Sequence, residues 1–386
     1  MKKIFLVDDD AVVQLLYRRK LEQGGFEVWL AEDGLQAIQL LGTFTPDLIL
    51  LDLMMPRLSG DSVLRFIRSQ PKLAKLPVVI LTNAFMSDQA RAVSVMGVER
   101  AIVKADCTPE KMLEIASQIL GVTSQPAATP AAADPLLPAE DHSPAREHFL
   151  ENAGSRIGDL RDLCQEFKAE PESATRSGNL AELYSQTHHL TGAAGLAGCH
   201  HLALMGGALE ALLFELGEKP QFVNPSTART VVSAVDYLAL LFEDARNVRR
   251  PESLTGEVLI VDDDPLANRI ALAALSRAKL NARATENSLT ALDLLAQTHF
   301  DLFLLDIEMP HLNGYELCRK IRCLPGYEKT PVIYITAHGD FESRAKSILA
   351  GGNDLIAKPI FPIELAVKAV THLIRGRLAA TVPAAL

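Results

Sequence analysis

Carboxylate, hydroxyl and ammonium side chains recur in this chain in one order and with one spacing, twice. The set in the first third of the chain is Asp8, Asp9, Asp52, Thr82 and Lys104. The second set lies 254 residues further on and is Asp262, Asp263, Asp306, Thr336 and Lys358. A single offset shared by so many polar positions rarely arises by chance, so the chain contains two copies of one domain.

These side chains suit the transfer of a phosphoryl group to a carboxylate. An acceptor carboxylate needs a divalent metal on the phosphoryl oxygens, a cation for the developing charge, and an in-line position. Asp8, Asp9 and Asp52 would crowd three negative charges, which is costly unless a cation neutralises them. Mg²⁺ prefers oxygen ligands and is the expected ion, one in each copy. Lys104 would supply a mobile cation and Thr82 a hydroxyl donor.

Short apolar runs precede these polar residues and predict the elements that position them. Residues 4–7, 48–51 and 78–81 are apolar at consecutive positions, as strands buried on both faces of a parallel sheet are. Stretches of helical period separate the runs, so each copy is predicted to be a doubly wound α/β domain. Because ligands of such sheets lie at the carboxyl ends of the strands, the fold should gather the polar residues at that edge.

The middle of the chain has a different composition. Residues 123–142 are rich in Ala and Pro, which predicts a semi-extended linker. Residues 143–248 carry apolar side chains at spacings of three and four, with breaks at prolines and at Gly178, which predicts an antiparallel bundle of about four or five helices. A short linker, 249–255, follows. The predicted domains are residues 1–122, 143–248 and 256–378.

Composition narrows the class of protein. The formal net charge of −10 and the pI near 5.5 argue against a nucleic-acid binder, which usually has a basic face. The five cysteines are odd in number and form no CxxC pair, so neither a disulfide framework nor a zinc site is expected. The start of the chain does not resemble a signal peptide, and no apolar run approaches 18 residues. These features predict a cytoplasmic protein without membrane insertion.

Both α/β copies resemble response-regulator receiver domains. The first shows VDD, DLMMPRLSG, LT and VK at its landmarks, and the second shows VDD, DIEMPHLNG, ITA and AKP. The resemblance implies a flavodoxin-like fold with Asp52 and Asp306 as phosphoacceptors. It implies that the phosphoryl oxygens are held by Thr82, Lys104, Thr336 and Lys358. It implies that the metal ligands are Asp8, Asp9, Asp52 and the backbone carbonyl of Met54 in one copy, and Asp262, Asp263, Asp306 and the backbone carbonyl of Glu308 in the other.

The two copies depart from the family pattern near the lysine. Members of the family usually carry a switch aromatic three residues before it, where this chain has Ala101 and Leu355. The first copy also has Ala105 after its lysine, where proline is usual, and Asn83 after its threonine, where alanine is usual. We therefore expect neither copy to signal phosphorylation through the usual threonine–aromatic coupling.

A run of histidines and small residues lies in the helical middle, THHLTGAAGLAGC at 187–199. Neutral imidazole is a good nucleophile near neutral pH, and phosphohistidine is labile enough to pass its group on. Gly192 lies four residues after His188, on the same helical face, and leaves room for a donor. Gly195 and Gly198 in the same helix would each cost about 1 kcal/mol relative to Ala, which close packing would justify.

The run resembles the H-x-x-K-G-S/A-A core of histidine-phosphotransfer (HPt) domains, which are four-helix bundles with an exposed phosphoacceptor histidine. The resemblance implies that His188 is the acceptor and Gly192 the spacing glycine. Thr191 stands in place of the family's lysine, so one phosphate-stabilising cation is missing. His189 is the rival acceptor, although it would place Ala193 rather than glycine one turn ahead.

Receiver, phosphotransfer and receiver domains together predict a phosphorelay protein of a two-component system. A separate sensor histidine kinase would feed the aspartates, His188 would exchange phosphoryl groups with Asp52 and Asp306, and a partner would provide the output, since the sequence shows no output domain. Such a phosphoprotein is a carrier rather than an enzyme. The alternative is a kinase-binding scaffold or phosphate-sink adaptor tuned by receiver phosphorylation. No dinucleotide-binding, P-loop or kinase ATP-site motif supports a conventional enzyme.

Overall fold

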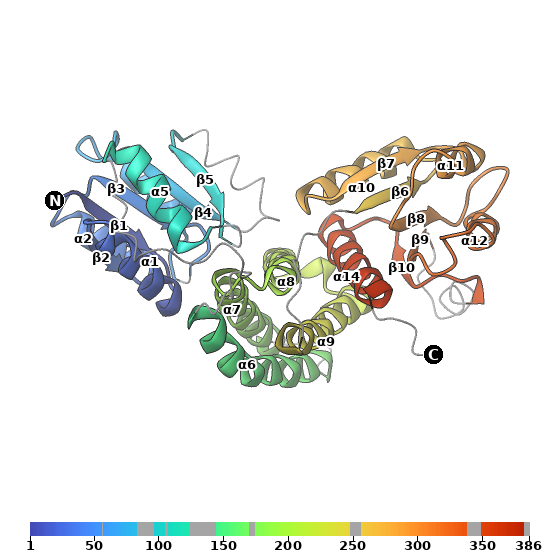
Figure 1. Ribbon diagram of the computed structural model, residues 1–386, viewed down its shortest axis with the longest axis horizontal. Helices are drawn as coiled ribbons and strands as arrows, with labels where there is room; N and C mark the ends of the chain where they lie inside the picture. Colours follow the sequence, from blue (N-terminus) through green and yellow to red (C-terminus); the bar gives the residue numbers. More distant parts are fainter. Residues whose placement is uncertain are drawn as a thin grey trace, which may run out of the picture. The chain divides into compact units, whose positions relative to one another are not determined.

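The computed structural model describes residues 1–55, 57–82, 96–104, 107–122, 144–169, 174–247, 256–337 and 349–381. It contains two five-stranded sheets, with a helical region between them in the sequence (Figure 1). The two predicted linkers, 123–142 and 249–255, lie outside the described residues. The chain divides into two compact units, Met1–Ala153 with His189–Ala203, and Gly154–His188 with Leu204–Leu386.

The first sheet is parallel throughout, with strand order β2-β1-β3-β4-β5. Side chains of β1, β3 and β4 are buried because helices cover both faces of a doubly wound sheet. Helices α1 and α5 pack together over one face, and α2 packs against α3. The elements are β1 Lys3–Val7, α1 Ala11–Gln23, β2 Glu27–Ala31, α2 Gly34–Leu41, β3 Leu48–Asp52, α3 Gly60–Ser69, β4 Val78–Thr82, β5 Arg100–Val103 and α5 Pro109–Leu120.

The second sheet repeats this topology, with order β10-β9-β8-β6-β7, again parallel throughout. Its core contains aromatic side chains, including Phe303 and Tyr334. The two parallel α/β sheets confirm this part of the predicted fold class. The elements are β6 Glu257–Val261, α10 Pro265–Arg277, β7 Asn281–Thr285, α11 Ser288–Leu295, β8 Leu302–Asp306, α12 Gly314–Arg322, β9 Val332–Thr336, β10 Asp354–Ala357 and α14 Pro362–Thr381.

The sequence places a glycine eight residues after each predicted phosphoacceptor, and the structure explains why. Gly60 is the first residue of α3, and Gly314 is the first residue of α12. A Cβ at Gly60 would collide with the backbone carbonyl oxygen of Asp52, and one at Gly314 with that of Asp306. The helix after each acceptor strand therefore starts directly against the strand's last peptide, which only glycine permits.

We expect Gly314→Ala to lower the free energy of unfolding by about 1–3 kcal/mol, because neither the carbonyl of Asp306 nor the start of α12 has room to move aside. Urea unfolding of the full chain measures this. Gly158→Ala, in the interior of α6, is the matched control, since a Cβ there meets nothing within 4 Å. The control should gain about 0.5–1 kcal/mol from helix propensity. A Gly314→Ala variant as stable as the wild type would contradict the prediction.

The described residues of the middle of the chain form four α-helices and one 3₁₀ turn. Their bounds are α6 Pro144–Ala169, α7 Ala174–Leu196, α8 His200–Glu218, η2 Pro220–Phe222 and α9 Pro225–Asn247. In the second unit their apolar stripes meet in a core that includes Leu160, Leu183, Leu209, Leu212 and Leu238. Among the described residues, no helix has both the length and the apolar character needed to cross a membrane.

Two glycine predictions in this region were wrong. Gly178 lies inside α7 rather than at a break between helices. Gly198 follows the end of α7 and adopts a φ of 68°, so it is not a helical residue that weakens the helix. A left-handed glycine after a helix is a frequent helix stop, and here it separates α7 from α8.

Trp29 is the one tryptophan of the sequence and lies in β2 of the first sheet. Its ring stacks on that of Phe44, with 4.5 Å between ring centroids and 22° between planes. The indole Nε1 donates a hydrogen bond to Glu27 at 2.8 Å. All of these contacts are made within the first receiver-like domain.

Candidate functional site

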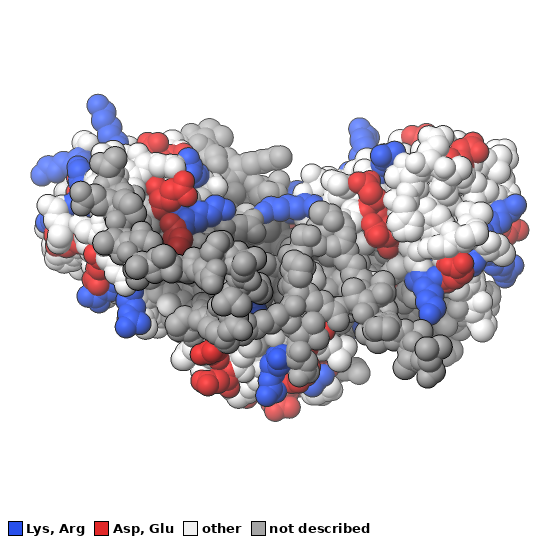
Figure 2. Space-filling view, viewed as in Figure 1, with Lys and Arg blue, Asp and Glu red and all other residues white. Residues whose placement is uncertain are grey.

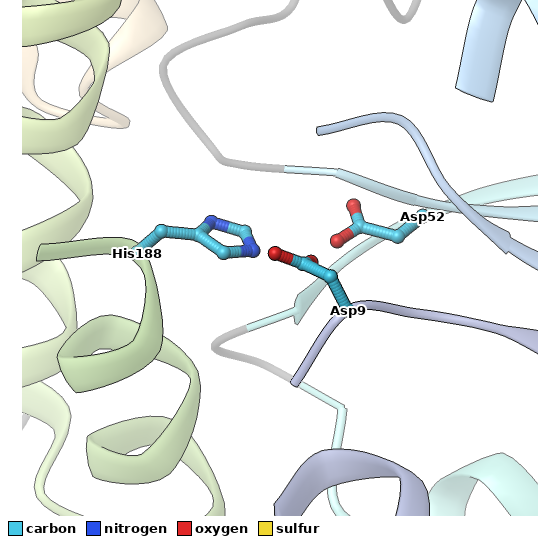
Figure 3. Close-up of side chains that lie close together, drawn as sticks. All are labelled: Asp9, Asp52 and His188. Carbon is cyan, nitrogen blue, oxygen red and sulfur yellow. The ribbon is translucent and has the colours of Figure 1, made fainter. Parts of the chain in front are cut away.

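The first polar set gathers at the carboxyl edge of its sheet, as the doubly wound topology requires. Asp8 follows β1, Asp52 ends β3, Thr82 ends β4 and Lys104 follows β5. The Nζ of Lys104 donates to Asp52 Oδ2 at 2.6 Å and lies 3.0 Å from Asp8 Oδ2. Asp9 and Asp52 carry carboxylate oxygens within 4.8 Å of each other (Figure 3).

The charge of Lys104 holds this cluster together. Its side chain is only 10% exposed, and burial opposes its charge, but Asp52 and Asp8 outweigh burial and raise its pKa well above the usual value. Asp52 also accepts a hydrogen bond from the backbone N–H of Met54 at 3.1 Å. The carboxylate of Asp52 is therefore held between a cation and a backbone donor, with both of its oxygens oriented.

The second set forms the same constellation in a more open setting. Lys358 Nζ lies 3.1 Å from Asp262 Oδ2 and 3.2 Å from Asp306 Oδ1, and its side chain is 28% exposed, against 10% for Lys104. Burial, and then the charge of Asp262, raise the pKa of Asp306 to about 6, because Lys358 compensates only in part. The acceptor of the second site is thus less completely neutralised by its lysine.

The donor set of each site fits Mg²⁺. Asp262, Asp263 and Asp306 each offer an oxygen, and the three oxygens lie within 4.8 Å of one another. Carboxylate oxygens are the ligands that hard divalent cations prefer, and a bound cation would relieve the repulsion that raises the pKa of Asp306. The roles of the Met54 and Glu308 carbonyls as metal ligands stay predictions.

The raised pKa of Asp306 predicts a pH-dependent stabilisation by Mg²⁺. A carboxyl group whose pKa rises on folding favours the folded state at low pH, and this contribution is lost as the pH rises through about 6. Mg²⁺ binds the ionised form, so it should raise the Tm of the full chain more at about pH 7.5 than at about pH 5. Melting curves in EDTA and in Mg²⁺ measure this. Asp306→Asn should remove the part of the pH dependence that belongs to the second site; an unchanged dependence would contradict the assignment.

His188 projects from α7 (Figure 3) and is held by a carboxylate from the next helix. Its Nδ1 lies 2.9 Å from Oε1 of Glu210 on α8, and the ring of Tyr184 stacks on the imidazole with 6.1 Å between centroids. Glu210 is 2% exposed, and its contact with Nδ1 fixes the orientation of the imidazole ring. The accessibility of His188 to a donor stays a prediction.

Sequence reasoning missed Glu210. It lies 22 residues after His188, on another helix, in a stretch that is otherwise apolar and supplies the buried core residues Leu209 and Leu212. The sequence does offer one indication of this contact: a single acidic residue within an apolar helical stripe is expected to be buried, and a buried acid requires a partner. Because a carboxylate oxygen accepts hydrogen bonds, Glu210 favours the tautomer with the proton on Nδ1, which leaves Nε2 of His188 with a free lone pair.

The helical turn after His188 packs on the acidic loop within the first unit. His189 Nδ1 lies 3.6 Å from Asp10 Oδ2, and a Cβ at Gly192 would lie 3.4 Å from Val13 and 3.6 Å from Asp10. Leu196 joins the core of the first sheet and its helices. Burial raises the pKa of Asp10, but the hydrogen bond to His189 and the charge of Lys104 outweigh it and lower the pKa.

Asp10 has a second role beside this packing, because its carboxylate accepts a hydrogen bond from Val13 N at the start of α1. Asp10 is buried, and its Oδ2 lies beside the ring of His189. A Cβ at Gly192 would be in ordinary van der Waals contact with Val13 and Asp10. The roles of His189 as rival acceptor and of Gly192 as spacing glycine stay predictions.

The face seen in Figure 2 carries acidic and basic side chains interspersed over its described residues. The five cysteines are free, and four of them are buried.

Comparison with known proteins identifies the two α/β copies. A family model described as the response regulator receiver domain matches residues 4–117 and 258–370, more than half of the chain. A segment of 109 residues is 34% identical to an uncharacterized 14.6 kDa protein of Leptolyngbya boryana, covering 28% of this chain and 83% of that protein.

Two larger relatives match over similar lengths. The signal transduction histidine-protein kinase BarA of Escherichia coli is 36% identical over 103 residues, which are 27% of this chain and 11% of the kinase. The transcriptional regulatory protein ResD of Bacillus subtilis is 34% identical over 120 residues, which are 31% of this chain and 49% of that regulator. The chain thus spans about a tenth of one relative and about half of the other.

Proposed function

Because the chain belongs to the response regulator receiver domain family, with two such domains, we propose that it is a phosphorelay protein that passes phosphoryl groups between Asp52, His188 and Asp306. A separate sensor histidine kinase in the cytoplasm would supply the phosphoryl group, and a partner protein would act on it. The observation that carries the proposal is the packing of the helical turn after His188 on the Asp10 loop of the first receiver.

In the phosphorylation of Asp52, the carboxylate is the only group of this protein that would form a covalent bond. One carboxylate oxygen attacks the phosphorus of the donor, an O–P bond forms, and the bond to the donor breaks with its electron pair leaving on the donor. Lys104, which contacts Asp52, and the buried Thr82 at the end of β4 would hold the phosphoryl oxygens. A divalent cation held by Asp8, Asp9 and Asp52 would neutralise negative charge on those oxygens when bound.

Transfer to His188 follows from the tautomer that Glu210 selects. The lone pair of Nε2 attacks phosphorus, the N–P bond forms, and the O–P bond breaks to regenerate the Asp52 carboxylate. The proton stays on Nδ1, so the ring becomes cationic, and the adjacent Glu210 carboxylate stabilises that charge. Thr191 supplies no cation here, so the positive charge beside the phosphoryl group would be that of the imidazolium ring itself, which Glu210 stabilises.

In this scheme, Asp306 of the second receiver exchanges phosphoryl groups with a phosphohistidine, as acceptor or as donor. Asp306 contacts Lys358 as Asp52 contacts Lys104, and the tether within one chain would give effective concentrations in the mM range for an encounter with a histidine. The protein itself would be a carrier, with Mg²⁺-dependent transfer and self-dephosphorylation rather than enzymatic turnover. The competing reading is a scaffold whose docking is tuned by receiver phosphorylation.

Residue-resolved phosphoryl occupancy tests the proposal. The full chain is incubated with Mg²⁺ and a small phosphodonor, and the label is separated by its stability in acid and in base and located in peptides. A relay gives an acyl phosphate on an aspartate and a base-stable phosphohistidine at His188. Label that stays on the aspartates, with none on His188 in the wild type, would favour the scaffold.

A further inference from the structure

The second receiver is joined to the helical middle by a built interface within the second unit. Helix α14 packs against α9. The ring of Phe361, just before α14, stacks on Phe222 of η2 with 4.5 Å between centroids and 3° between planes. The guanidinium of Arg375 lies over the ring of Tyr237 at 5.3 Å, a distance typical of a cation–π contact.

A buried carboxylate gives this interface its specificity. Glu364 is 4% exposed and accepts hydrogen bonds from Ser226 Oγ at 2.7 Å and Thr230 Oγ1 at 3.0 Å, both on α9. Lys368 Nζ lies 4.0 Å from the same oxygen. A buried charge is costly unless dedicated partners satisfy it, so two hydroxyl donors aimed at one carboxylate mark a specific contact.

The interface is also joined to the phosphorylation site by a short stretch of chain. Lys358, the cation at Asp306, precedes Phe361 by only three residues. At the other end of β10, Asp354 accepts a hydrogen bond from Lys368 at 2.7 Å and lies 3.4 Å from His372 Nε2. Strand β10, which ends one residue before Lys358, is therefore tied to α14 at its start through Asp354. At its end it leads within a few residues to Phe361, just before α14.

We infer that the helical bundle of this chain is the effector of its second receiver. Phosphorylation of Asp306 draws Lys358 toward the phosphoryl oxygens, and the movement reaches α9 through Phe361 and Glu364. The inference rests on the proposed function only in that Asp306 carries a phosphoryl group. This route differs from the usual threonine–aromatic coupling, for which the chain has Leu355 in place of the aromatic residue.

The same contacts reach the helix that positions His188. Thr371 of α14 donates a hydrogen bond to the sulfur of Met205 at 3.4 Å, and Met205 lies on α8. Glu210, which holds His188, lies five residues further along that helix. The state of Asp306 would therefore bias the contact between Glu210 and His188, and by reciprocity the bundle would bias phosphorylation of Asp306.

Hydrogen exchange of the full chain tests the coupling without any transfer step. Asp52→Asn leaves only Asp306 able to be loaded with beryllium fluoride and Mg²⁺, which mimic an acyl phosphate. Loading should change exchange rates in peptides of α9 and α8 by about fivefold or more. Phe361→Ala and, as a milder variant that keeps the fold, Ser226→Ala should reduce that change, while peptides of β8 still report the loading.

Two results would overturn the inference. One is unchanged exchange in α9 and α8 when the β8 peptides show that Asp306 is loaded. The other is a full response in both interface variants. If His188 never accepted a phosphoryl group, the relay proposal would be contradicted, but the coupling could still be measured. The two proposals can therefore fail separately.

Discussion

Replacing Asp52 by Asn is expected to abolish phosphorylation of His188, lowering the rate of base-stable labelling by at least about 10³-fold. The carboxamide keeps the shape of the side chain and can still accept the hydrogen bond from Met54 N, but its oxygen is a poor nucleophile and it cannot form the acyl phosphate. Quenched-flow labelling of the full chain with a small phosphodonor measures the initial rate at His188.

Asp306→Asn is the matched control, because it makes the same change in the other copy of the domain. The helical turn after His188 packs on the first receiver, and the second receiver engages α9 through α14. Asp306→Asn should therefore leave the initial rate at His188 within about threefold, apart from the coupling inferred above. Loss of labelling in this variant, with normal labelling in Asp52→Asn, would reverse the assignment of the donor. A chain labelled at His188 in both single variants accepts from the phosphodonor directly.

Glu210→Gln is expected to slow transfer between Asp52 and His188 by about 10²–10⁴-fold, the range of effects found when a group that orients or stabilises a reacting side chain is removed. The amide can donate to Nδ1, which allows the tautomer with its proton on Nε2 and so protonates the nucleophile. It also removes the charge that stabilises the cationic ring after transfer. Single-turnover transfer rates measure the loss, and nitrogen NMR of His188 shows which ring atom carries the proton.

Glu215→Gln supplies the control on the same helix. Glu215 pairs with Lys219 one turn away, at 2.8 Å, in an exposed ion pair of the kind that contributes little. Its loss should leave the transfer rate unchanged. If Glu210→Gln slowed transfer but the histidine kept its proton on Nδ1, the carboxylate would act only through its charge. An unchanged rate would show that Glu210 is structural.

The sequence was sufficient to predict features that repeat along the chain or that follow the periodicity of a strand or helix. The common offset located both receiver domains, and the buried strands placed Asp52 and Asp306 at their carboxyl ends, where the structure has them. The packing of helices from different domains was not predictable. Ser226 and Thr230 look like ordinary polar residues of a helix, and nothing in the local pattern indicates that their hydroxyls bind Glu364, 138 and 134 residues away.

The contact of Glu210 with His188 is also a contact between helices that the sequence does not predict. A periodicity argument assigns a helical face to the core or to solvent, but it does not show which side chain from another helix will meet it. Asp10 combines both kinds of contact: its cap on α1 is local, whereas its pairing with His189 depends on two segments far apart in the sequence.

The single tryptophan gives the first receiver an optical signal of its own. Trp29 stacks on Phe44 inside the first receiver, so indole fluorescence follows the unfolding of that domain alone. Far-ultraviolet circular dichroism averages over both sheets and all of the helices. Two compact units of different stability would give two non-coincident transitions, and the difference between the curves would yield the stability of the second receiver with its bundle. The intact chain therefore reports on its parts without labels, cuts or added chromophores.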